Sequence, residues 1–144
     1  MQITNRKAHF NYTIEEEIEA GIVLVGSEVK SIRQAKVSLN ESYIASIKGE
    51  LFLVNANIAE YKGANNFNHD PLRPRKLLLH KKQIEKLISK IEIKGYSIVP
   101  LRIFFNTKNY AKIVIGVGKG KKLYDKRDTI KKRDEQRRLQ RESD

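Results

Sequence analysis

The chain has 144 residues, of which 40% are hydrophobic, and a formal net charge of +12 at neutral pH. That length and apolar content suit one domain with a single core, and the excess of positive charge indicates a polyanionic partner, usually nucleic acid. The absence of cysteine excludes disulfides, thiol catalysis and thiolate metal sites.

The first strand-like region runs from Ala8 to Val25. At its start Phe10, Tyr12 and Ile14 alternate with polar residues, which is the period-two pattern of a half-buried strand. Gly21 in the same region predicts a bulge or a sharp bend, as at a barrel corner.

Residues 26–33 predict a short helix. Ser27 can cap it, Glu28 suits the positive end of the helix dipole, and Lys30 and Arg33 share its exposed side.

A hairpin is predicted between Tyr43 and Tyr61, with a turn at residues 48–50 and a second arm over residues 51–58. The following residues, 62–72, are rich in turn formers and predict a loop.

A basic stretch leads into the clearest helix of the sequence. After His80, apolar residues recur at the spacing of one buried helix face: Ile84, Leu87, Ile88 and Ile91. Gly95 is placed to end this helix, because glycine adopts a left-handed turn without strain. Residues 96–105 and 111–117 then predict a second hairpin, which turns at residues 106–109.

The composition changes near Gly118. From Lys119 onward, large apolar residues are too few to dock on a core, whereas good helix formers are frequent. We therefore expect residues 1–118 to form the folded domain. Residues 119–144 are expected to be a basic tail, disordered when free and helical when bound.

Together these segments predict a mainly β domain with flanking helices. Short spaced strands favour a small closed antiparallel barrel, for which the oligonucleotide-binding type is the natural candidate.

No catalytic or metal site is evident. The histidines His9, His69 and His80 lack metal-binding spacing, and no phosphate-binding loop is present. The carboxylates at residues 15–17 could bind Mg²⁺, but a solvated strand edge is the favoured interpretation. We expect no enzymatic activity and no cofactor. No apolar run approaches the roughly 20 residues of a membrane helix, and no secretory signal is seen, so a cytoplasmic protein is expected.

Nucleic-acid binding fits the composition better. Lysine and arginine bind phosphates, and flat side chains such as Tyr61, Phe67 and Tyr124 can stack on unpaired bases. For each aromatic residue the alternative role is core packing. For the basic tail the alternative is a tether that binds anionic partners without specificity.

Four stretches taken together resemble one bacterial family, the SsrA-binding (tmRNA-binding) proteins, also called small protein B. They are residues 5–8, 19–33, 75–81 and 119–127. The resemblance covers nearly the whole chain, and the motifs stand in the family's order. Ala35 departs from the family in standing where glycine is common, and Tyr124 in standing where several members carry histidine.

The resemblance implies a non-catalytic barrel that binds the tRNA-like domain of tmRNA and enters stalled ribosomes with it. The protein then stands in for the missing anticodon stem, and translation switches to the tag-encoding frame. Small-subunit rRNA is an implied partner, as is, indirectly, the elongation factor that carries charged tmRNA. A monomer is expected.

By position, the resemblance makes Glu19, Leu78 and His80 RNA contacts. From the residues alone, Leu78 fits a core position and His80 a helix cap. The other expected RNA-binding residues are Asn5, Arg6, Lys7, Lys30, Arg33, Arg75, Lys76, Lys119, Lys121 and Lys122. Those expected in the decoding centre and mRNA channel are Tyr124, Asp125, Lys126, Arg127, Lys131, Lys132 and Arg133.

Two rival functions remain at this stage: a general single-strand-binding barrel, and a nuclease or RNA-modifying enzyme. Competition with unstructured RNA tests the first, and RNA turnover with Mg²⁺ tests the second.

Overall fold

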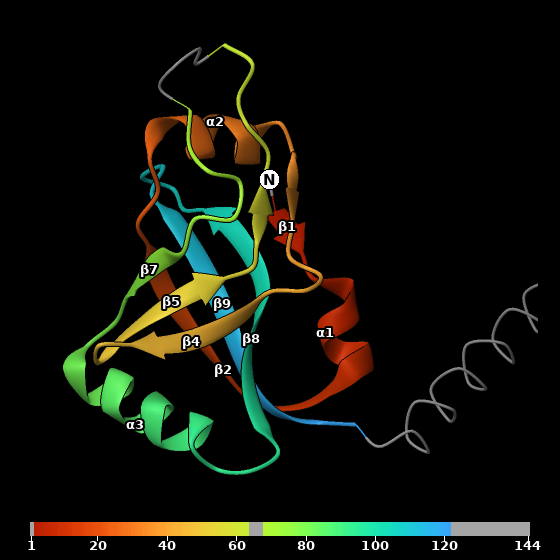
Figure 1. The fold of residues 1–144 in the computed structure, drawn as a ribbon, viewed down its shortest axis with the longest axis vertical. Helices are drawn as coiled ribbons and strands as arrows, with labels where there is room; N and C mark the ends of the chain where they lie inside the picture. The colour runs from red at the N-terminus through yellow and green to blue at the C-terminus, as the bar shows by residue number, and fades with distance from the viewer. Residues whose placement is uncertain (1, 64–67, 122–144) are drawn as a thin grey trace, which may run out of the picture.

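The computed structural model describes residues 2–63 and 68–121. In this part of the chain, antiparallel strands form the body, and helices cover its top, bottom and one side (Figure 1). The elements are β1 (Gln2–Thr4), α1 (Arg6–Asn11), β2 (Tyr12–Ile22), α2 (Gly26–Arg33), β3 (Val37–Ser38), β4 (Tyr43–Ile47), β5 (Glu50–Val54), β6 (Asn57–Ile58), β7 (Arg75–Leu78), α3 (Lys81–Ile91), β8 (Tyr96–Phe105) and β9 (Ala111–Gly120).

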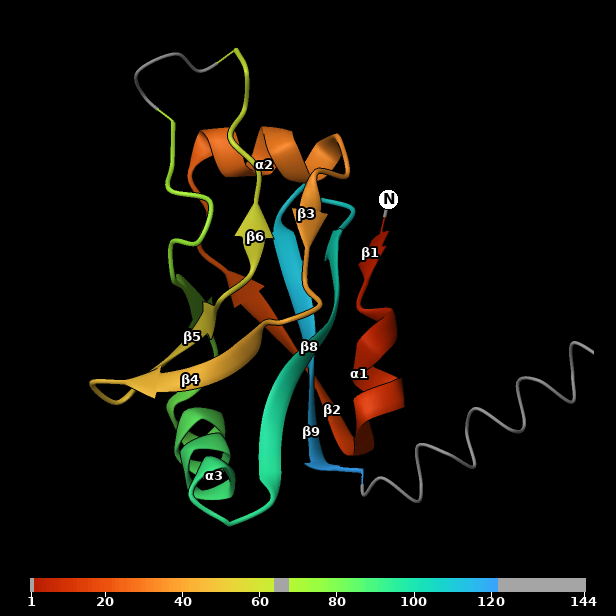
Figure 2. The same ribbon diagram turned by 45° about the vertical axis from the view of Figure 1, so that its right-hand side comes forward.

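Seven strands form one sheet in the order β1-β8-β9-β2-β7-β5-β4, and β3 pairs with β6 beneath α2 (Figure 2). Every pair is antiparallel. Although β4 lies beside β8, no strand pairing joins them among the described residues. The prediction of a mainly β, antiparallel fold is confirmed, but the sheet is open and the predicted closure is wrong.

Part of the β8 edge is unavailable to a further strand. Pro100 has no N–H to offer a neighbouring strand. The carbonyls of Pro100 and Leu101 accept hydrogen bonds from the Asn5 side-chain amide and backbone N–H, both at 2.8 Å. Asn5 therefore occupies the edge of β8 at these two residues, where β4 could not pair.

The main core lies between the curved sheet and α3. It contains the apolar residues of β5, β7, β8 and β9 that point inward, such as Leu53, Leu77, Ile98 and Ile115, together with Leu87 of α3. The predicted helix after His80 is confirmed. It ends at Ile91, and Gly95, with φ of 89°, makes the turn into β8.

A helix replaces the first part of the predicted strand at residues 8–25. Ala8 of α1 packs against Val99, Leu101 and Val114, which lie on the outer face of β8 and β9. This second apolar cluster holds residues 6–11 as a helix, despite the alternating pattern. Tertiary contacts of this kind override a short periodic signal.

The bulge predicted at Gly21 lies elsewhere. The register of β2 against β9 shifts between Ile14 and Glu16, whereas Gly21 pairs regularly with Lys112 and Leu78. A Cβ on Gly21 would come within 3.1 Å of the Leu78 Cβ. The glycine therefore permits a close approach of β2 and β7.

The predicted helix at residues 26–33 is confirmed, but Ser27 does not cap it. The Ser27 hydroxyl instead bonds to His69 Nδ1 at 2.8 Å, and the Glu28 carboxylate accepts from the Val25 N–H at 2.9 Å. Just beyond the helix, Ala35 has a φ of 57°. This left-handed conformation costs a residue other than glycine about 1–2 kcal/mol.

The first hairpin is confirmed, with a tight turn in which Lys48 and Gly49 both have positive φ. Its second arm is shorter than predicted, because Asn55, at φ of 62°, turns the chain out of β5. Residues 57–58 leave the large sheet and pair with β3. The second hairpin is confirmed, and β9 continues to Gly120, two residues beyond the predicted end of the domain.

Candidate nucleic-acid interface

The central feature of the candidate interface is a pocket of about 440 Å³ where β2, β7 and β9 meet the start of α3. Pairing of Gly21 with Leu78 brings two segments that are distant in sequence into contact. The pocket is lined by Glu19, Gly21, Leu78, Leu79, His80, Gln83 and Lys112. The three predicted RNA contacts, Glu19, Leu78 and His80, thus lie in one place.

Leu78 lies on the surface of this pocket and not in the core. It is 55% exposed, while its neighbour Leu77 is buried, because successive residues of a strand point to opposite faces. An exposed leucine between polar groups offers an apolar surface that a nucleotide could cover. The interpretation of Leu78 as a core residue is therefore wrong.

His80 stands at the N-terminal cap position of α3, and its side chain is exposed. Its backbone N–H donates to Gln83 Oε1 at 3.2 Å. Gln83 and Lys112 also line the pocket, and neither was predicted as a site residue. Gln83 could have been found from the sequence, because it stands three residues after His80, which is the spacing of a helix-capping pair.

Behind β7 lies a buried ion-pair network, and it corrects one prediction. Arg75 is 0% exposed, and its guanidinium donates to the Glu28 carboxylate and to the carbonyls of Ala56 and Pro71. Arg73 Nη2 also donates to Glu28, at 2.5 Å. Arg75 was predicted to bind RNA, but its donors are directed into the protein. Its role is to hold β7 against α2.

The electrostatics of this network favour an ionised Glu28. Burial alone would raise the pKa of the Glu28 carboxyl, but hydrogen bonds from Arg73, the Val25 N–H and Arg75 together lower it below its ordinary 4.5. Burial also lowers the pKa of Arg75, and Glu28 opposes this change. The pair is charged at neutral pH, because an arginine side chain does not lose its proton in proteins.

We expect stability to fall at acid pH through Glu28. A carboxyl whose pKa is lower in the folded state stabilises the fold above its unfolded value, near 4.5, and this contribution is lost as pH falls through the lower folded value. Urea unfolding at pH 7, 5 and 3 measures the effect. The Glu28→Gln variant should lose less stability over this range than the parent chain. If the free energy of unfolding falls equally with pH in both chains, Glu28 is not the group responsible.

Asn5 is also buried, which corrects a second prediction. Its side-chain amide donates to the carbonyls of Pro100 and Leu39, at 2.8 and 3.3 Å. These bonds fix the start of α1 on β8, so the Asn5 amide group serves the fold and not an RNA contact. Its neighbours Arg6 and Lys7 are exposed on α1, and Lys7 pairs with Glu41 at 3.6 Å.

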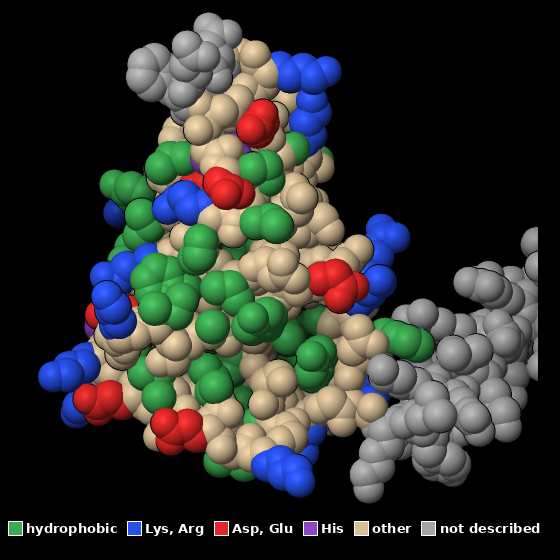
Figure 3. Space-filling model, viewed as in Figure 1, with side chains coloured by type: hydrophobic (Ala, Val, Ile, Leu, Met, Phe, Trp, Pro, Cys, Tyr) green, Lys and Arg blue, Asp and Glu red, His purple; other side chains and the backbone are tan. Residues whose placement is uncertain are grey.

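Other predicted basic residues lie on separate surfaces. On α2, Lys30 lies 5.3 Å from the centre of the Tyr61 ring, and the Arg33 guanidinium 4.3 Å from that of Phe105. Lys76 is exposed on β7 and lies 4.0 Å from Glu50. The positive charge is thus spread over several faces, as the blue side chains of Figure 3 show for one of them.

Lys119 lies at the opposite end of β2 and β9 from Glu19. Lys119 and Lys90 each place an ammonium group 4.9 Å from the centre of the Tyr96 ring, and the Tyr96 hydroxyl donates to Glu15 at 2.9 Å. Lys121 follows, with its N–H bonded to the Asn11 carbonyl at 2.8 Å. The remaining predicted residues, Phe67, Lys122, Tyr124, Asp125, Lys126, Arg127, Lys131, Lys132 and Arg133, lie outside the described residues, as does the predicted tail helix.

Within residues 2–63 and 68–121, no group of three or more histidine, aspartate and glutamate side chains could hold a metal ion. In the same residues, no helix combines the length and the apolar character needed to cross a membrane.

Comparison with known proteins places these features in context. A family model described as "SmpB protein" matches residues 2–144. An SsrA-binding protein of Rickettsia canadensis (strain McKiel) is 60% identical over 133 residues, which cover 92% of this chain and 88% of the relative. One of Bradyrhizobium sp. (strain BTAi1) is 58% identical over 130 residues, 90% of this chain and 83% of the relative.

A solved structure described as "tmRNA-SmpB: a journey to the center of the bacterial ribosome" is also similar. Its chain is 47% identical, with a TM-score of 0.72, and the match covers 85% of each chain. The likeness therefore extends to the fold as well as to the sequence.

Proposed function

The chain belongs to the SmpB protein family, and on that premise we propose that it is an SsrA-binding protein that serves trans-translation. It binds the tRNA-like domain of tmRNA and delivers it to stalled ribosomes, where the ribosome is rescued and the unfinished peptide is tagged. It acts as an RNA-binding factor and not as an enzyme. Its partners are tmRNA and the ribosome, with the elongation factor on charged tmRNA as an indirect one. It acts as a monomer in the cytoplasm.

The observation that carries the proposal is the pocket where Glu19, Leu78 and His80 meet. The resemblance assigns RNA contacts to these positions, and the fold brings them together from β2, β7 and the start of α3. Glu19 repels phosphate, so its role is to accept hydrogen bonds from a base amino group or a ribose 2′-hydroxyl. Leu78 covers an apolar base or sugar face, and the exposed Lys76 next to it binds phosphate.

The finer architecture and the tail belong to the same proposal. The body is a variant of the oligonucleotide-binding barrel that is open between β4 and β8, and residues 1–118 form most of it. The tail of residues 119–144 enters the decoding centre and lies as a helix in the empty mRNA channel. There its basic residues neutralise rRNA phosphates, and Tyr124 stacks on a base.

We expect Leu78→Ala to weaken binding of the isolated tRNA-like domain of tmRNA by about five- to tenfold. Burying a whole leucine side chain is worth about 1.5–3 kcal/mol, and Leu78 still has about half of its surface to bury. Fluorescence anisotropy with the labelled RNA domain, in the presence of excess unstructured RNA, measures the change.

Leu72→Ala is the matched control, since Leu72 is 49% exposed and lies away from the pocket. Glu19→Gln, which keeps an acceptor oxygen, should retain more affinity than Glu19→Ala. If Leu78→Ala binds as tightly as Leu72→Ala, or if unstructured RNA displaces the domain from the parent chain, the proposal fails. The second outcome would favour a general single-strand-binding protein.

A further inference from the structure

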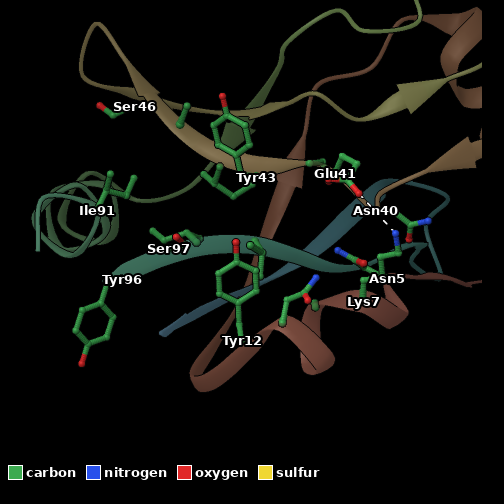
Figure 4. Close-up of a pocket in the computed structure, with 17 residues that line it drawn as sticks. Asn5, Lys7, Tyr12, Asn40, Glu41, Tyr43, Ser46, Ile91, Tyr96 and Ser97 are labelled. Atoms are coloured by element: carbon green, nitrogen blue, oxygen red, sulfur yellow. Dashed lines mark ion pairs between the residues drawn. The ribbon is translucent and has the colours of Figure 1, made fainter. Parts of the chain in front are cut away.

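A second pocket, of about 480 Å³, lies where the sheet is open between β4 and β8. It is bordered by α1 and by the start of β2 (Figure 4), and it shares no lining residue with the pocket of Glu19 and Leu78. Its volume is within the range of pockets that hold a small ligand, about 300–1,000 Å³. Nothing in the proposed function occupies it.

The lining of this pocket combines aromatic rings with neutral hydrogen-bonding groups. Tyr43 of β4 and Tyr12 at the start of β2 line it from opposite sides, and Tyr43 is 50% exposed. Side-chain amides and hydroxyls also line the pocket, among them those of Asn11, Ser46 and Ser97. A nucleobase requires this combination, because its faces stack on flat rings and its edges both donate and accept hydrogen bonds.

The rim of the pocket carries one positive and one negative side chain, and the positive one can bind a phosphate. Lys7 of α1 lines the pocket and pairs with Glu41 across it at 3.6 Å, and both side chains are largely solvent-exposed. Such an exposed ion pair contributes little stability, so Lys7 can exchange Glu41 for a phosphate at little cost. Figure 3 shows hydrophobic side chains over β4 on this face, with both basic and acidic side chains around them.

The backbone beside the pocket argues against an added peptide strand. Strand addition requires a run of free N–H and C=O groups along an edge. On β8, Pro100 has no N–H, and the carbonyls of Pro100 and Leu101 are already bonded to Asn5. A peptide strand added to β8 would find no regular partner at these two residues, whereas a single nucleotide needs none.

We propose that the pocket between β4 and β8 binds one unpaired nucleotide of an RNA, with its base against the Tyr43 ring and its phosphate at Lys7. This site is separate from the Glu19–Leu78 surface, so one chain can hold a folded RNA and a single-stranded segment at the same time. The inference shares with the proposed function only the premise that the partner is RNA.

The test is binding of fluorescein-labelled tetra-adenylate to the full chain and to its variants. We expect Tyr43→Ala to weaken binding at least about fivefold, since stacking one base is worth about 1–3 kcal/mol. Tyr43→Phe should bind like the parent chain, because it keeps the ring. Tyr110→Ala is the control, as Tyr110 is 65% exposed and lies outside the pocket.

Several results would overturn the inference. These are the absence of tetra-adenylate binding, equal affinities of Tyr43→Ala and Tyr110→Ala, or a Tyr43→Phe variant as weak as Tyr43→Ala. Competition by a neutral valine–threonine hexapeptide would assign the pocket to a peptide instead. Leu78→Ala and Tyr43→Ala together separate the two proposals, since Leu78→Ala should weaken binding of the tRNA-like domain more than that of tetra-adenylate, and Tyr43→Ala should do the reverse.

Discussion

Replacing Glu28 with alanine is expected to lower the free energy of unfolding by about 3–5 kcal/mol. That is a large share of the 5–15 kcal/mol that a domain typically has. Glu28 and Arg75 are both fully buried, and Arg75 has no other carboxylate bonded to it in the described residues. Without Glu28, a guanidinium would remain in the interior with its charge uncompensated. Urea unfolding at neutral pH measures the loss.

Two comparisons make this result specific to the buried pair. Glu50→Ala removes a half-exposed carboxylate 4.0 Å from Lys76, and it should cost less than about 1 kcal/mol. The double variant Glu28→Leu with Arg75→Met should recover much of the loss, because apolar residues of similar size can replace a buried ion pair. A loss in Glu28→Ala no larger than that in Glu50→Ala would show that the pair does not hold β7 in place.

Removing residues 122–144 is expected to abolish peptide tagging while leaving affinity for the tRNA-like domain nearly unchanged, because it removes only Lys122 of the expected RNA-binding residues. The fold itself indicates where to cut. Strand β9 pairs with β2 as far as Gly120, and the Lys121 N–H bonds to Asn11. A chain that ends at Lys121 keeps every described strand and the pocket of Glu19 and Leu78. Anisotropy with the RNA domain measures binding, and a reconstituted translation assay with stalled ribosomes measures tagging.

The matched variant for this experiment keeps the full length and changes only Asp125, Lys126 and Arg127 to alanine. It should bind tmRNA normally and impair tagging after ribosome entry. Cutting before Lys119 is a poorer test, because it would also remove strand pairs with Tyr12 and Thr13 and the contact of Lys119 with Tyr96. If the cut after Lys121 weakens RNA binding as much as Leu78→Ala does, the division between body and tail is wrong.

Elements with strong local signals were predictable. The apolar spacing from Ile84 to Ile91 placed α3, and the turn formers around Gly49 placed the hairpin of β4 and β5. Elements that depend on distant contacts were not. The helix α1 forms because Ala8 packs on the outer face of β8 and β9, and no pattern within residues 6–11 indicates that contact.

The sequence by itself determined the family, the mainly β character, the position of the basic residues along the chain and the grouping of Glu19, Leu78 and His80 as candidates. Only the tertiary structure decided which of the predicted residues are exposed and which are buried. In the stretch from Arg75 to Leu78, the arginine is buried against Glu28 and the leucine is exposed, the reverse of what their side-chain types suggest. Burial depends on which distant segment lies opposite each residue, here α2 for Arg75 and β2 for Leu78. A carboxylate at the right distance can bring a charge inside, and the alternation of side chains along a strand can turn an apolar side chain to the surface.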